Sequence, residues 1–600
     1  MLLRISILFE GYEVTMAFKM LLHIYFVFLF FLISTTVFCI SFTDVTDKAN
    51  VSGIGISNGI AFIDYDNDGY LDLYVSSDPS DILYRNNGDG TFTDVTDDVG
   101  IAFIGDGVGI AFGDYNNDSY LDLYIPVNNG SDVFFQNEAG KTFRDVTKSL
   151  RIDNPARARS ASFADFDKDG FLDICVINEG SPNILYKNVN GKFFEDITQI
   201  MNVAHTGPGR CCIWGDYDND GDQDLYVTNK GAFNILYRND GLGFKDVTKI
   251  AGVEGNGDSV GTAFADYDND GYLDLCFGGN GRIFLCHNNH DGTFLDVTDK
   301  AGLTISGERC TPSFGDFDND GDLDLFLAVW KGRSLLYNNN GDGTFTDVSD
   351  EASVGSFGNS WSAISGDYNN DGFLDIYTSF TTRSNILYEN IGNANNWVKV
   401  KVSGSMSNRY AVGARLKLTA NGITQIREIS GGTGYSSQDS LIAQFGIGAN
   451  IKADLLEVTF PSGISVKLTN IQPNRLIVID ENLSAVETPC VKHPLLITNN
   501  SLPDKSCLLN AYPNPFNPET WIPYQLASQS DVEIRIFDSI GSLVRTLKLG
   551  NKNPGYYTSK IKAGYWDGRN ENGETVVSGI YFCQLNTRDG VDVKKMVLNK

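Results

Sequence analysis

The chain is 600 residues long, which is enough for several domains with cores of their own. It carries 76 acidic and 46 basic side chains, a formal net charge of −30, so it lacks the basic surface that binding to nucleic acid requires. Beyond the first forty residues, short runs rich in Val, Ile, Tyr and Phe are bounded by Asn, Asp and Gly. This pattern predicts an all-β protein that binds no nucleic acid.

Residues 1–39 are predicted to be a secretory signal peptide, with Met16 and Met20 as alternative starts. The apolar stretch 21–38 follows Lys19 and becomes polar near its far end, as expected before a cleavage site. An uncleaved anchor is the alternative, because an apolar stretch of eighteen residues can just span a bilayer. Either interpretation predicts a protein that is secreted or held at the cell surface.

Three sequence elements recur seven times in matched register between residues 42 and 390. Two of the series advance by 50, 51, 51, 50, 50 and 51 residues, and such a fixed period indicates a repeat architecture. The element Phe-x-Asp-Val-Thr, which varies slightly in two copies, begins at Phe42, Phe92, Phe143, Phe194, Phe244, Phe294 and Phe345. An acidic loop begins at Asp64, Asp114, Asp165, Asp216, Asp266, Asp316 and Asp367. The element Asn-Ile-Leu-Tyr-x-Asn, with variants, ends at Asn86, Asn137, Asn188, Asn239, Asn288, Asn339 and Asn390.

Each repeat predicts four short strands, in the first copy at about 59–63, 71–75, 82–85 and 91–95. Four strands in about 50 residues are typical of a propeller blade, whose sheet needs neighbours to bury both faces. The chain begins with a lone closing strand at 42–46, and the seventh unit lacks one. We therefore predict a seven-bladed β-propeller over residues 40–395, in which the N-terminal strand completes the last blade.

Cys276 and Cys286 occupy the positions that Tyr74 and Tyr84 hold in the first blade. We expect the two cysteines to face each other across adjacent strands. Both a cross-strand disulfide and simple burial of two small apolar side chains are consistent with that arrangement.

The acidic loops have the form Asp-x-Asp/Asn-x-Asp-Gly-x-x-Asp. In the first loop, the side-chain oxygens at positions one, three, five and nine belong to Asp64, Asp66, Asp68 and Asp72, and Tyr70 adds its backbone carbonyl. Calcium takes six to eight oxygen ligands at about 2.3–2.6 Å, whereas magnesium demands a stricter octahedron and zinc prefers nitrogen and sulfur. We therefore expect up to seven Ca²⁺ ions, one in each blade.

The other loops supply equivalent ligand sets. These are Asp114, Asn116, Asp118 and Asp122; Asp165, Asp167, Asp169, Phe171 and Asp173; Asp216, Asp218, Asp220, Asp222 and Asp224; Asp266, Asp268, Asp270, Tyr272 and Asp274; Asp316, Asp318, Asp320, Asp322 and Asp324; and Asp367, Asn369, Asp371, Phe373 and Asp375. Asp, Asn and Gly are also ordinary turn residues. However, 26 aspartates in ligand positions would repel one another strongly without a cation, which favours calcium. The loops beginning at Asp114 and Asp367 have an amide at position three, and the former has Ser119 in place of glycine, so we expect weaker binding there.

An EF-hand needs Glu at position twelve and flanking helices, whereas these loops close with Asp at position nine and lead directly into a strand. In this respect the units resemble FG-GAP and VCBS repeats and the propellers of integrin α-subunits.

Residues 396–481 follow the repeats and resemble the ASPIC/UnbV domain of relatives of cartilage acidic protein. The motifs are Asn-Trp-Val-Lys-Val at 396–400, Gly-Tyr-Ser-Ser-Gln at 434–438, Gln-Phe-Gly-Ile-Gly at 444–448 and Phe-Pro-Ser-Gly from Phe460. Phe460 stands where that family usually has Trp, a change that should preserve an apolar contact. The resemblance implies an extracellular calcium-binding protein with no established catalytic residues.

A linker is predicted over 482–507, where Cys490 and Cys507 could close a loop. Residues 508–600 contain Tyr-Pro-Asn-Pro-Phe-Asn-Pro-Glu-Thr at 512–520 and resemble a FlgD-type Ig-like domain and the sorting module of type IX secretion. This resemblance implies a role in outer-membrane passage and surface attachment, through the secretion machinery. A plain Ig-like spacer is the alternative.

Enzymatic chemistry finds little support in the motifs. The histidines are His23, His205, His287, His290 and His493, and none lies in a nucleophile or zinc motif. We expect His287 and His290 to be solvated residues of a blade turn. We therefore expect a monomeric, non-catalytic adhesion or ligand-binding module whose ligand is an extracellular protein or glycan. The alternative is an extracellular enzyme that acts on polysaccharides and is built on a calcium-stabilised propeller.

Overall fold

The computed structural model describes residues 40–53, 56–78, 80–103, 105–481, 483–489, 506–508, 518–557, 563–588 and 590–598. The predicted signal peptide lies outside these residues. The chain divides into two units at His493 and Pro494, and each unit is described by itself. Nearly all regular structure is β, as the sequence predicted, and no helix of the described residues is long and apolar enough to cross a membrane.

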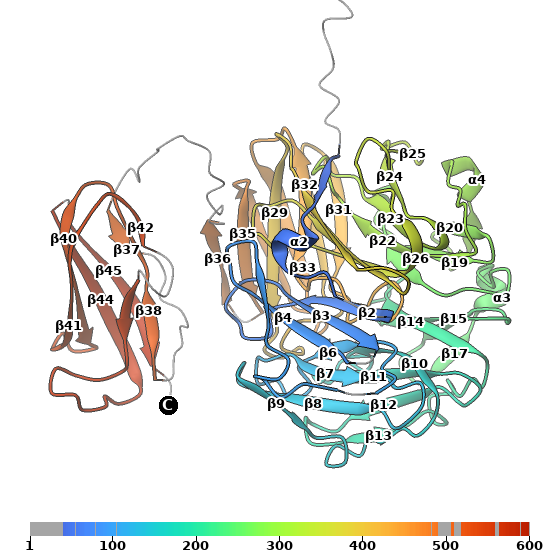
Figure 1. Ribbon diagram of the computed structural model, residues 1–600, viewed down its shortest axis with the longest axis horizontal. Coiled ribbons are helices and arrows are strands. Elements are labelled where there is room, and N and C mark those ends of the chain that lie inside the picture. The colour runs from blue at the N-terminus through green and yellow to red at the C-terminus, as the bar shows by residue number, and fades with distance from the viewer. Residues whose placement is uncertain are drawn as a thin grey trace, which may run out of the picture. The chain divides into compact units, whose positions relative to one another are not determined.

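Strands of the described chain up to Asn390 form seven antiparallel groups of four, here called groups one to seven (Figure 1). Groups six and seven join into one larger sheet through pairing of β23 with β26. In chain order the groups are β2 (Ile56–Ile63), β3 (Asp72–Asp78), β4 (Ile82–Asn86) and β5 (Phe92–Asp94); β6 (Ala111–Gly113), β7 (Asp122–Ile125), β8 (Val133–Glu138) and β9 (Thr142–Asp145); β10 (Ala158–Ala164), β11 (Asp173–Asn178), β12 (Ile184–Asn188) and β13 (Phe194–Asp196); β14 (Gly209–Gly215), β15 (Asp224–Asn229), β16 (Ile235–Asn239) and β17 (Phe244–Asp246); β18 (Thr262–Ala265), β19 (Asp274–Gly279), β20 (Arg282–Asn288) and β21 (Phe294–Asp296); β22 (Arg309–Gly315), β23 (Asp324–Arg333), β24 (Leu335–Asn339) and β25 (Phe345–Asp347); and β26 (Phe357–Gly366), β27 (Asp375–Phe380) and β28 (Ile386–Asn390) with β1 (Phe42–Asp44).

Contacts between successive groups close a ring. An Asn at position four of most acidic loops donates to a carbonyl in the next loop, as Asn67 does to Ser119 at 2.8 Å. The last of these bonds returns to the start, because Asn370 in group seven donates to the carbonyl of Gly69 in group one at 3.1 Å. The first strands of these two groups, β2 and β26, also lie side by side (Figure 1). A closed ring of four-stranded sheets is a β-propeller.

The N-terminal strand completes the last group, as predicted. β1 pairs antiparallel with β28, with Phe42 opposite Asn390. The motif Asp-Val-Thr that follows makes a turn, since Asp44 Oδ1 accepts bonds from both the backbone N–H and the hydroxyl of Thr46. That hydroxyl in turn accepts the N–H of Leu387 at 2.9 Å, which ties the turn to β28. Three copies of the turn continue into short helices, α2 (Thr46–Ala49), α3 (Thr248–Ala251) and α4 (Thr298–Ala301).

Cys276 and Cys286 do not face each other, so that expectation is wrong. The two-residue connection between β19 and β20 sets a register in which Cys276 lies opposite Leu285 and Cys286 opposite Leu275. A one-residue offset turns the two side chains to opposite faces of the sheet. Both thiols are free and buried, and they pack in different hydrophobic clusters. Cys507 is also free, whereas Cys490 lies outside the described residues.

Two further sheets follow the propeller within the first unit. One is ordered β32 (Ala443–Gly448), β29 (Asn396–Ser403), β35 (Arg475–Asp480) and β36 (Leu483–Pro489), and the other β31 (Ile423–Glu428), β30 (Arg415–Ala420), β33 (Ala453–Thr459) and β34 (Ser465–Ile471). Their core includes Leu416, Leu456 and Phe460, so Phe460 makes the apolar contact expected of it. Part of the predicted linker is a strand, because β36 pairs with β35.

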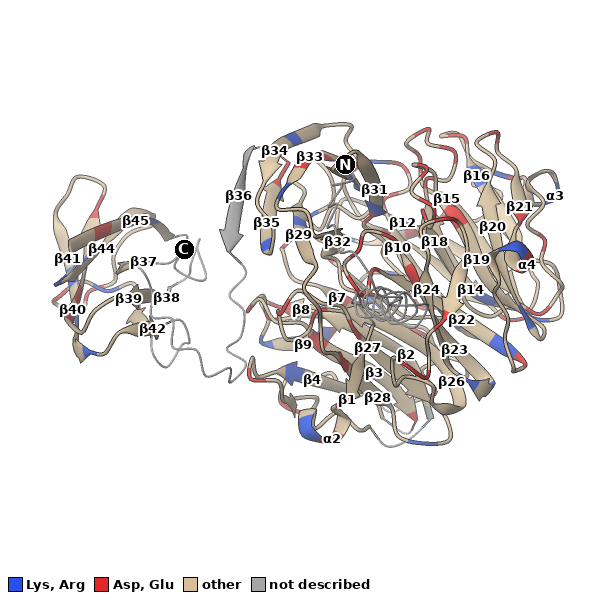
Figure 2. Cartoon of the chain, turned by 90° about the horizontal axis from the view of Figure 1, so that it is seen from above, with Lys and Arg blue, Asp and Glu red and all other residues tan. Residues whose placement is uncertain are grey.

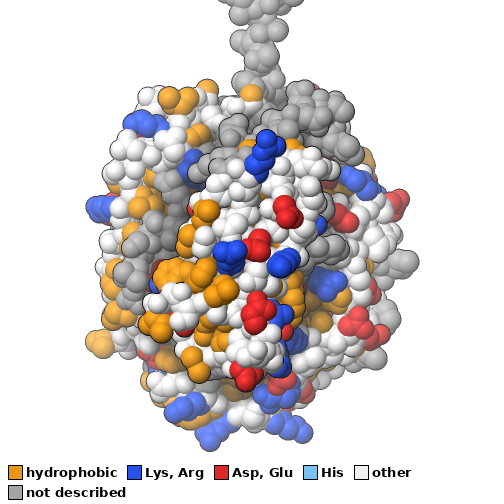
Figure 3. All heavy atoms as spheres, turned by 90° about the vertical axis from the view of Figure 1, so that its left-hand side faces the viewer, with side chains coloured by type: hydrophobic (Ala, Val, Ile, Leu, Met, Phe, Trp, Pro, Cys, Tyr) orange, Lys and Arg blue, Asp and Glu red, His pale blue; other side chains and the backbone are white. Residues whose placement is uncertain are grey.

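The second unit is a separate β module. Its sheets are β37 (Cys507–Leu508), β39 (Tyr524–Leu526) and β42 (Gly555–Tyr557); β38 (Thr520–Ile522) with β43 (Gly564–Trp566); and β41 (Leu543–Lys552), β40 (Ser530–Asp538), β44 (Gly579–Thr587) and β45 (Gly590–Leu598). Ile534, Trp566 and Leu585 lie in its core. Hydrophobic side chains also gather at the surface in Figure 3, and the exposed ones of this unit include Val591 and Val593 on β45.

Candidate metal loops and the domain that covers them

Each acidic loop connects the first strand of a group to the second and is held in one shape by its own backbone. In the first loop, Asp64 Oδ2 accepts the N–H of Gly69 at 3.3 Å, and Asp68 Oδ1 accepts the N–H of Tyr70 at 3.0 Å. Asn67 adopts a left-handed conformation with φ of 58°, and Gly69 has φ of 90°, which glycine tolerates best. Figure 2 shows acidic residues in the loops around the propeller. The repeated spacing thus produces a repeated loop geometry.

The last acid of each loop is a buried anchor. Asp72 is fully buried, its Oδ1 accepts the N–H of Asn86 at 2.8 Å, and its Oδ2 accepts the N–H of Tyr65 at 3.1 Å. The Asn at the end of the third strand bonds both its own loop and the preceding group, since Asn86 donates to the carbonyls of Leu71 and Tyr368. The third repeated sequence element therefore positions the acidic loops and links the groups.

Carboxylates from predicted ligand positions converge in several loops. Ligand atoms of Asp64, Asp66 and Asp72 lie within 4.8 Å of one another, and the same holds for the group formed by Asp165, Asp167 and Asp173. It also holds for Asp216, Asp218 and Asp224 and for Asp266, Asp268 and Asp270. The sixth loop is closed by bonds from the N–H of Asp320 to Asp316 Oδ1 at 3.1 Å and to Asp318 Oδ1 at 3.0 Å.

Buried carboxylate oxygens in three of these loops lack a hydrogen-bond donor in the part of the chain described. They are Oδ1 of Asp64, Asp165 and Asp216 and Oδ2 of Asp173. A buried charged oxygen without a partner is costly, and a hard divalent cation supplies the missing interaction. The donor set, all oxygen and mostly anionic, fits calcium.

Burial and mutual repulsion also shift the acidity of these groups. Burial, followed by the charges of Asp66 and Asp64, raises the pKa of Asp72 well above its ordinary value. Burial is likewise the main cause that raises the pKa of Asp165 and of Asp266, each to about 7. A bound cation would reverse these shifts, because it favours the charged carboxylates.

The loop that begins at Asp114 keeps the common shape although it lacks glycine. Ser119 adopts φ of 77°, and its N–H still bonds Asp114 Oδ2 at 2.7 Å. In this loop Asn116 Nδ2 donates to Asp118 Oδ2 at 3.0 Å, and Asn116 Oδ1 accepts the N–H of Asp118 at 2.9 Å. In the seventh loop, Asn369 Oδ1 accepts the N–H of Asp371 at 3.0 Å.

Two acids at position seven point away from their own loops. Asp222 pairs with Lys168 at 2.5 Å, and Asp322 Oδ1 accepts a bond from Asn269 at 2.7 Å. Both contacts join neighbouring groups. For these two residues, therefore, only the backbone carbonyl remains as the predicted ligand.

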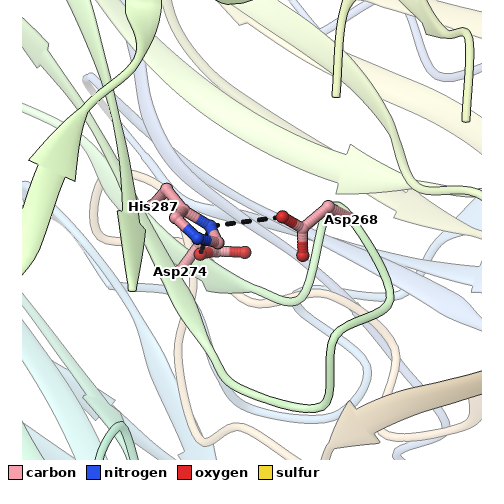
Figure 4. A group of neighbouring side chains, drawn as sticks. All are labelled: Asp268, Asp274 and His287. Atoms are coloured by element: carbon pink, nitrogen blue, oxygen red, sulfur yellow. Dashed lines mark ion pairs between the residues drawn. The ribbon is translucent and has the colours of Figure 1, made fainter. Parts of the chain in front are cut away.

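A further position reaches the loops, and we did not identify it from the sequence. In groups three and five, the residue that precedes the terminal Asn of the third strand lies beside the ligand positions. In group three, Lys187 Nζ bonds Asp169 at 2.9 Å and also contacts Asp167. In group five, His287 lies on β20 between Asp268 and Asp274 (Figure 4), so the expectation that it is a solvated turn residue is wrong. Aligning the repeats would have revealed this position, because it immediately precedes the recurring Asn.

The domain formed by β29–β35 places basic side chains beside the acidic loops. Lys399 is buried and its Nζ lies 2.6 Å from Asp367 Oδ2, and Arg415 lies 3.4 Å from Asp216 Oδ2. Lys401 approaches Asp64 Oδ2 at 3.7 Å. In each case the cation meets Oδ2 of the first acid of the loop. In the loops that begin at Asp64 and Asp216, the other oxygen, Oδ1, is the unpartnered one.

A glycine-rich segment of the same domain, residues 430–440, bonds to the first strands of several groups. Gln438 exchanges backbone bonds with the first strand of group one, and its side chain bonds both the N–H and the carbonyl of Phe112 in group two. Gly431 bonds Phe163 in group three, and Gly434 bonds Thr262 in group five. A β-carbon on Gly431 would lie 2.1 Å from the carbonyl oxygen of Phe163, so only glycine fits there.

The fold and loops define a β-propeller with an acidic loop in each group, and comparison with protein families identifies its parts. The FG-GAP-like repeat matches residues 64–125, 165–227, 216–277, 266–327 and 316–378. The ASPIC and UnbV family matches residues 404–486, and the FlgD Ig-like domain matches residues 518–590. The predicted order of FG-GAP repeats, ASPIC/UnbV domain and FlgD-type Ig-like domain is therefore confirmed.

The chain is similar to cartilage acidic protein 1. The protein of Mus musculus is 24% identical over 344 residues, which are 56% of this chain and 38% of that protein. The protein of Xenopus tropicalis is 34% identical over 114 residues, which are 18% of this chain and 17% of that protein. The matches thus span less than half the length of these curated relatives.

Solved structures show only a general likeness. A lectin of Agrocybe aegerita, described as recognising non-reducing terminal N-acetylglucosamine, is 20% identical with a TM-score of 0.35, over 48% of this chain and 79% of that one. Sqt1 of Saccharomyces cerevisiae is 11% identical with a TM-score of 0.38, over 59% of this chain and 98% of that one. These scores are too low to support a functional argument.

Proposed function

We propose that this protein is a secreted or cell-surface calcium-binding propeller that acts as a ligand-binding or adhesion module and not as an enzyme. The observation that carries the proposal is the set of buried carboxylate oxygens in three acidic loops that have no hydrogen-bond donor among the residues that the structure describes. The FG-GAP and ASPIC/UnbV matches and the similarity to cartilage acidic protein 1 support an extracellular setting, where calcium is plentiful.

Residues 430–440 make main-chain bonds to the first strands of several groups, so this segment restricts access to the centre of the ring. We propose that a ligand is bound at the outer faces of the propeller. We propose that this ligand is an extracellular protein or a glycan, and that the protein acts as a monomer. Binding of purified protein to protein and glycan arrays, with calcium and with chelator, tests this. Calcium-dependent capture without turnover is expected, whereas release of products from a polysaccharide would favour the enzyme.

Calcium itself is tested by unfolding. At a free calcium concentration a hundredfold above Kd, each site stabilises the native state by about 2.7 kcal/mol, so chelation should lower the thermal midpoint substantially. Asp266→Ala should cost more than Asp114→Ala, whose loop already lacks its glycine and one acid. Asp89→Asn, in an exposed hairpin turn outside the loops, is the matched control. A midpoint unmoved by chelator, with no calcium in the purified protein, would contradict the proposal.

We further propose that residues 508–600 engage the secretion and attachment machinery, with export begun by the predicted signal peptide. The FlgD-type match supports an Ig-like module, and a plain spacer is the alternative. Fractionation of the native host that expresses the protein with and without this segment separates the two. Retention of the truncated protein in the periplasm is expected. Identical distributions of the two forms would show that the segment is a plain spacer and not a sorting module.

A further inference from the structure

A hollow lies at the strand ends opposite the acidic loops. In each group the first strand leads into the acidic loop and the second strand returns from it, so the other ends of these strands lie on the opposite face of the propeller. On that face, groups three, four and five surround an open hollow of about 390 Å³. Its lining includes Glu179, Arg210, Lys230, Asp258 and Asn280. Pockets for small ligands have volumes of about 300–1,000 Å³, so this hollow is large enough for one.

Positive charge is in excess around this hollow, although the chain as a whole is acidic. The basic side chains are Arg157, Arg159, Arg210, Lys230 and Arg309, and the acids that they meet are Glu179 and Asp258. Lys230 forms no ion pair within the described part of the chain, and burial, followed by the charges of Arg210 and Arg309, lowers its pKa. Because neighbouring cations disfavour the protonated lysine, an anionic ligand would stabilise it.

The arginines of group three and Arg210 are held in place by one acid. Glu179 Oε2 accepts a bond from Arg159 Nε at 2.6 Å and lies 3.2 Å from Arg157 Nη1, while its Oε1 accepts a bond from Arg210 Nη2 at 3.1 Å. The hydrogen bond from Arg210 is the main cause that lowers the pKa of Glu179 to about 2, so this carboxylate stays charged at neutral pH. One carboxylate among three guanidinium groups fixes their orientation and still leaves a net positive charge.

Asp258 adds a hydrogen-bond acceptor to the hollow. Its Oδ2 accepts bonds from Arg309 Nε at 3.2 Å and Nη2 at 3.0 Å, whereas its Oδ1 is buried and has no donor among the described residues. A buried acceptor without a donor is costly, and a hydroxyl group of a ligand would satisfy it. The same oxygen would repel a doubly charged phosphate. Cations for a carboxylate and an acceptor for a hydroxyl together suit a sugar acid.

A row of aromatic side chains borders the basic groups. Tyr435 stacks on Trp361 and Trp361 on Trp330, with ring centroids 5.3 and 4.2 Å apart. Burial raises the pKa of Tyr435 and the charge of Arg210 opposes that shift, so the hydroxyl lies within reach of this guanidinium group. At the other end of the row, Trp330 lies opposite Arg309 in the pairing of β22 with β23. Both tryptophans are partly exposed, and they offer apolar surface to the C–H groups of a sugar ring.

We infer that this hollow binds a uronic-acid unit of an extracellular polysaccharide, with the sugar carboxylate against Lys230 and Arg210 and a ring hydroxyl on Asp258 Oδ1. Arginine and lysine form their strongest hydrogen bonds with such anionic oxygens. The inference rests on the proposed ligand-binding role, to which it adds a site and a chemical class of ligand. It uses neither the acidic loops nor a metal ion.

Isothermal titration of the full chain, loaded with calcium, tests the inference with hexasaccharides of hyaluronan and of polygalacturonate. Hexasaccharides whose carboxyl groups have been reduced to alcohols, and dextran sulfate, are the comparison ligands. We expect binding of a uronate hexasaccharide, and binding about tenfold weaker in Lys230→Gln, which loses a charge-assisted hydrogen bond. Lys192→Gln, an exposed lysine in the turn between β12 and β13, is the matched control and should bind like the wild type. Binding should also weaken as NaCl is raised, because salt screens exposed charges.

The outcomes separate this inference from the proposed function. Absence of binding to both uronates, equal binding of the carboxyl-reduced forms, or a preference for dextran sulfate overturns the assignment of a sugar acid. Equal binding by the wild type and Lys230→Gln overturns the hollow as the site, and Lys230→Glu, which reverses the charge and should abolish binding, checks this result independently. Capture of another ligand on the arrays without any uronate binding would overturn this inference alone, whereas cleavage of the hexasaccharide would overturn the non-catalytic role alone.

Discussion

Asp81 is a buried acid in group one at a position where three other groups have an amide. Its Oδ1 accepts the N–H of Ser77 at 2.9 Å, and its Oδ2 accepts the hydroxyl of Tyr74 at 2.7 Å. The equivalent residues are Asn183, Asn234 and Asn385, and each accepts the corresponding backbone N–H through Oδ1. Asp81→Asn therefore imports a side chain that this fold already accommodates.

The expected effect follows from the pKa of Asp81, which burial raises from 3.8 to about 6. A raised pKa means that the folded state holds the proton more tightly than the unfolded state does. The stability from this group is therefore fully present below pH 4 and is lost as the pH rises through about 6. A shift of about 2 units corresponds to about 3 kcal/mol, which Asp81→Asn should recover at pH 8, where the wild-type carboxyl is ionised.

Denaturant unfolding of the two proteins from pH 4.5 to pH 8 in saturating calcium measures this difference. The advantage of Asp81→Asn should grow with pH and be smallest at the acidic end. The reciprocal change, Asn183→Asp in group three, should show the opposite trend, a loss of stability that appears above pH 6. A stability difference that stays constant across this pH range, for either variant, would refute the reasoning.

Three further changes test other parts of the structure. Deletion of residues 40–46 removes β1 and exposes the edge of β28, so we expect aggregation or a lower thermal midpoint; a truncated protein that stays monomeric and equally stable would contradict the role of β1 in ring closure. Gly431→Val forces a side chain against the carbonyl of Phe163, so proteolysis should cut the ASPIC/UnbV domain from the propeller faster than in the wild type; unchanged cleavage would argue against the packing of residues 430–440 in the channel. Lys399→Met leaves the buried Asp367 without its cation, and loss of one partner of a buried pair costs about 3–5 kcal/mol. The loss of stability should be larger after chelation, when no metal remains to balance the charge of Asp367. Equal losses with and without calcium would show that Lys399 and the metal site act independently.

Local pattern determined much of this protein. The period of about 50 residues, the spacing of acids in the loops and the lone N-terminal strand predicted the propeller, its ligand positions and its closure by β1 pairing with β28. These features are local because turns and strands depend on neighbouring residues, and repetition multiplies the signal. Motifs in the last two segments predicted the ASPIC/UnbV and FlgD-type domains in the same way.

Contacts across strands and between domains were decided only by the tertiary structure. The register of β19 and β20 separates Cys276 from Cys286, because a shift of one residue reverses the face to which a side chain points. The same strand β20 turns His287 toward Asp268 and Asp274 of the fifth loop; the recurring Asn288 marks this position in the sequence but not the face to which the side chain points. Lys399 is buried against Asp367, 32 residues away in the sequence, and Gly431 pairs with Phe163, 268 residues away. Such contacts cannot be predicted from local sequence, because the two surfaces become complementary only when both domains have folded.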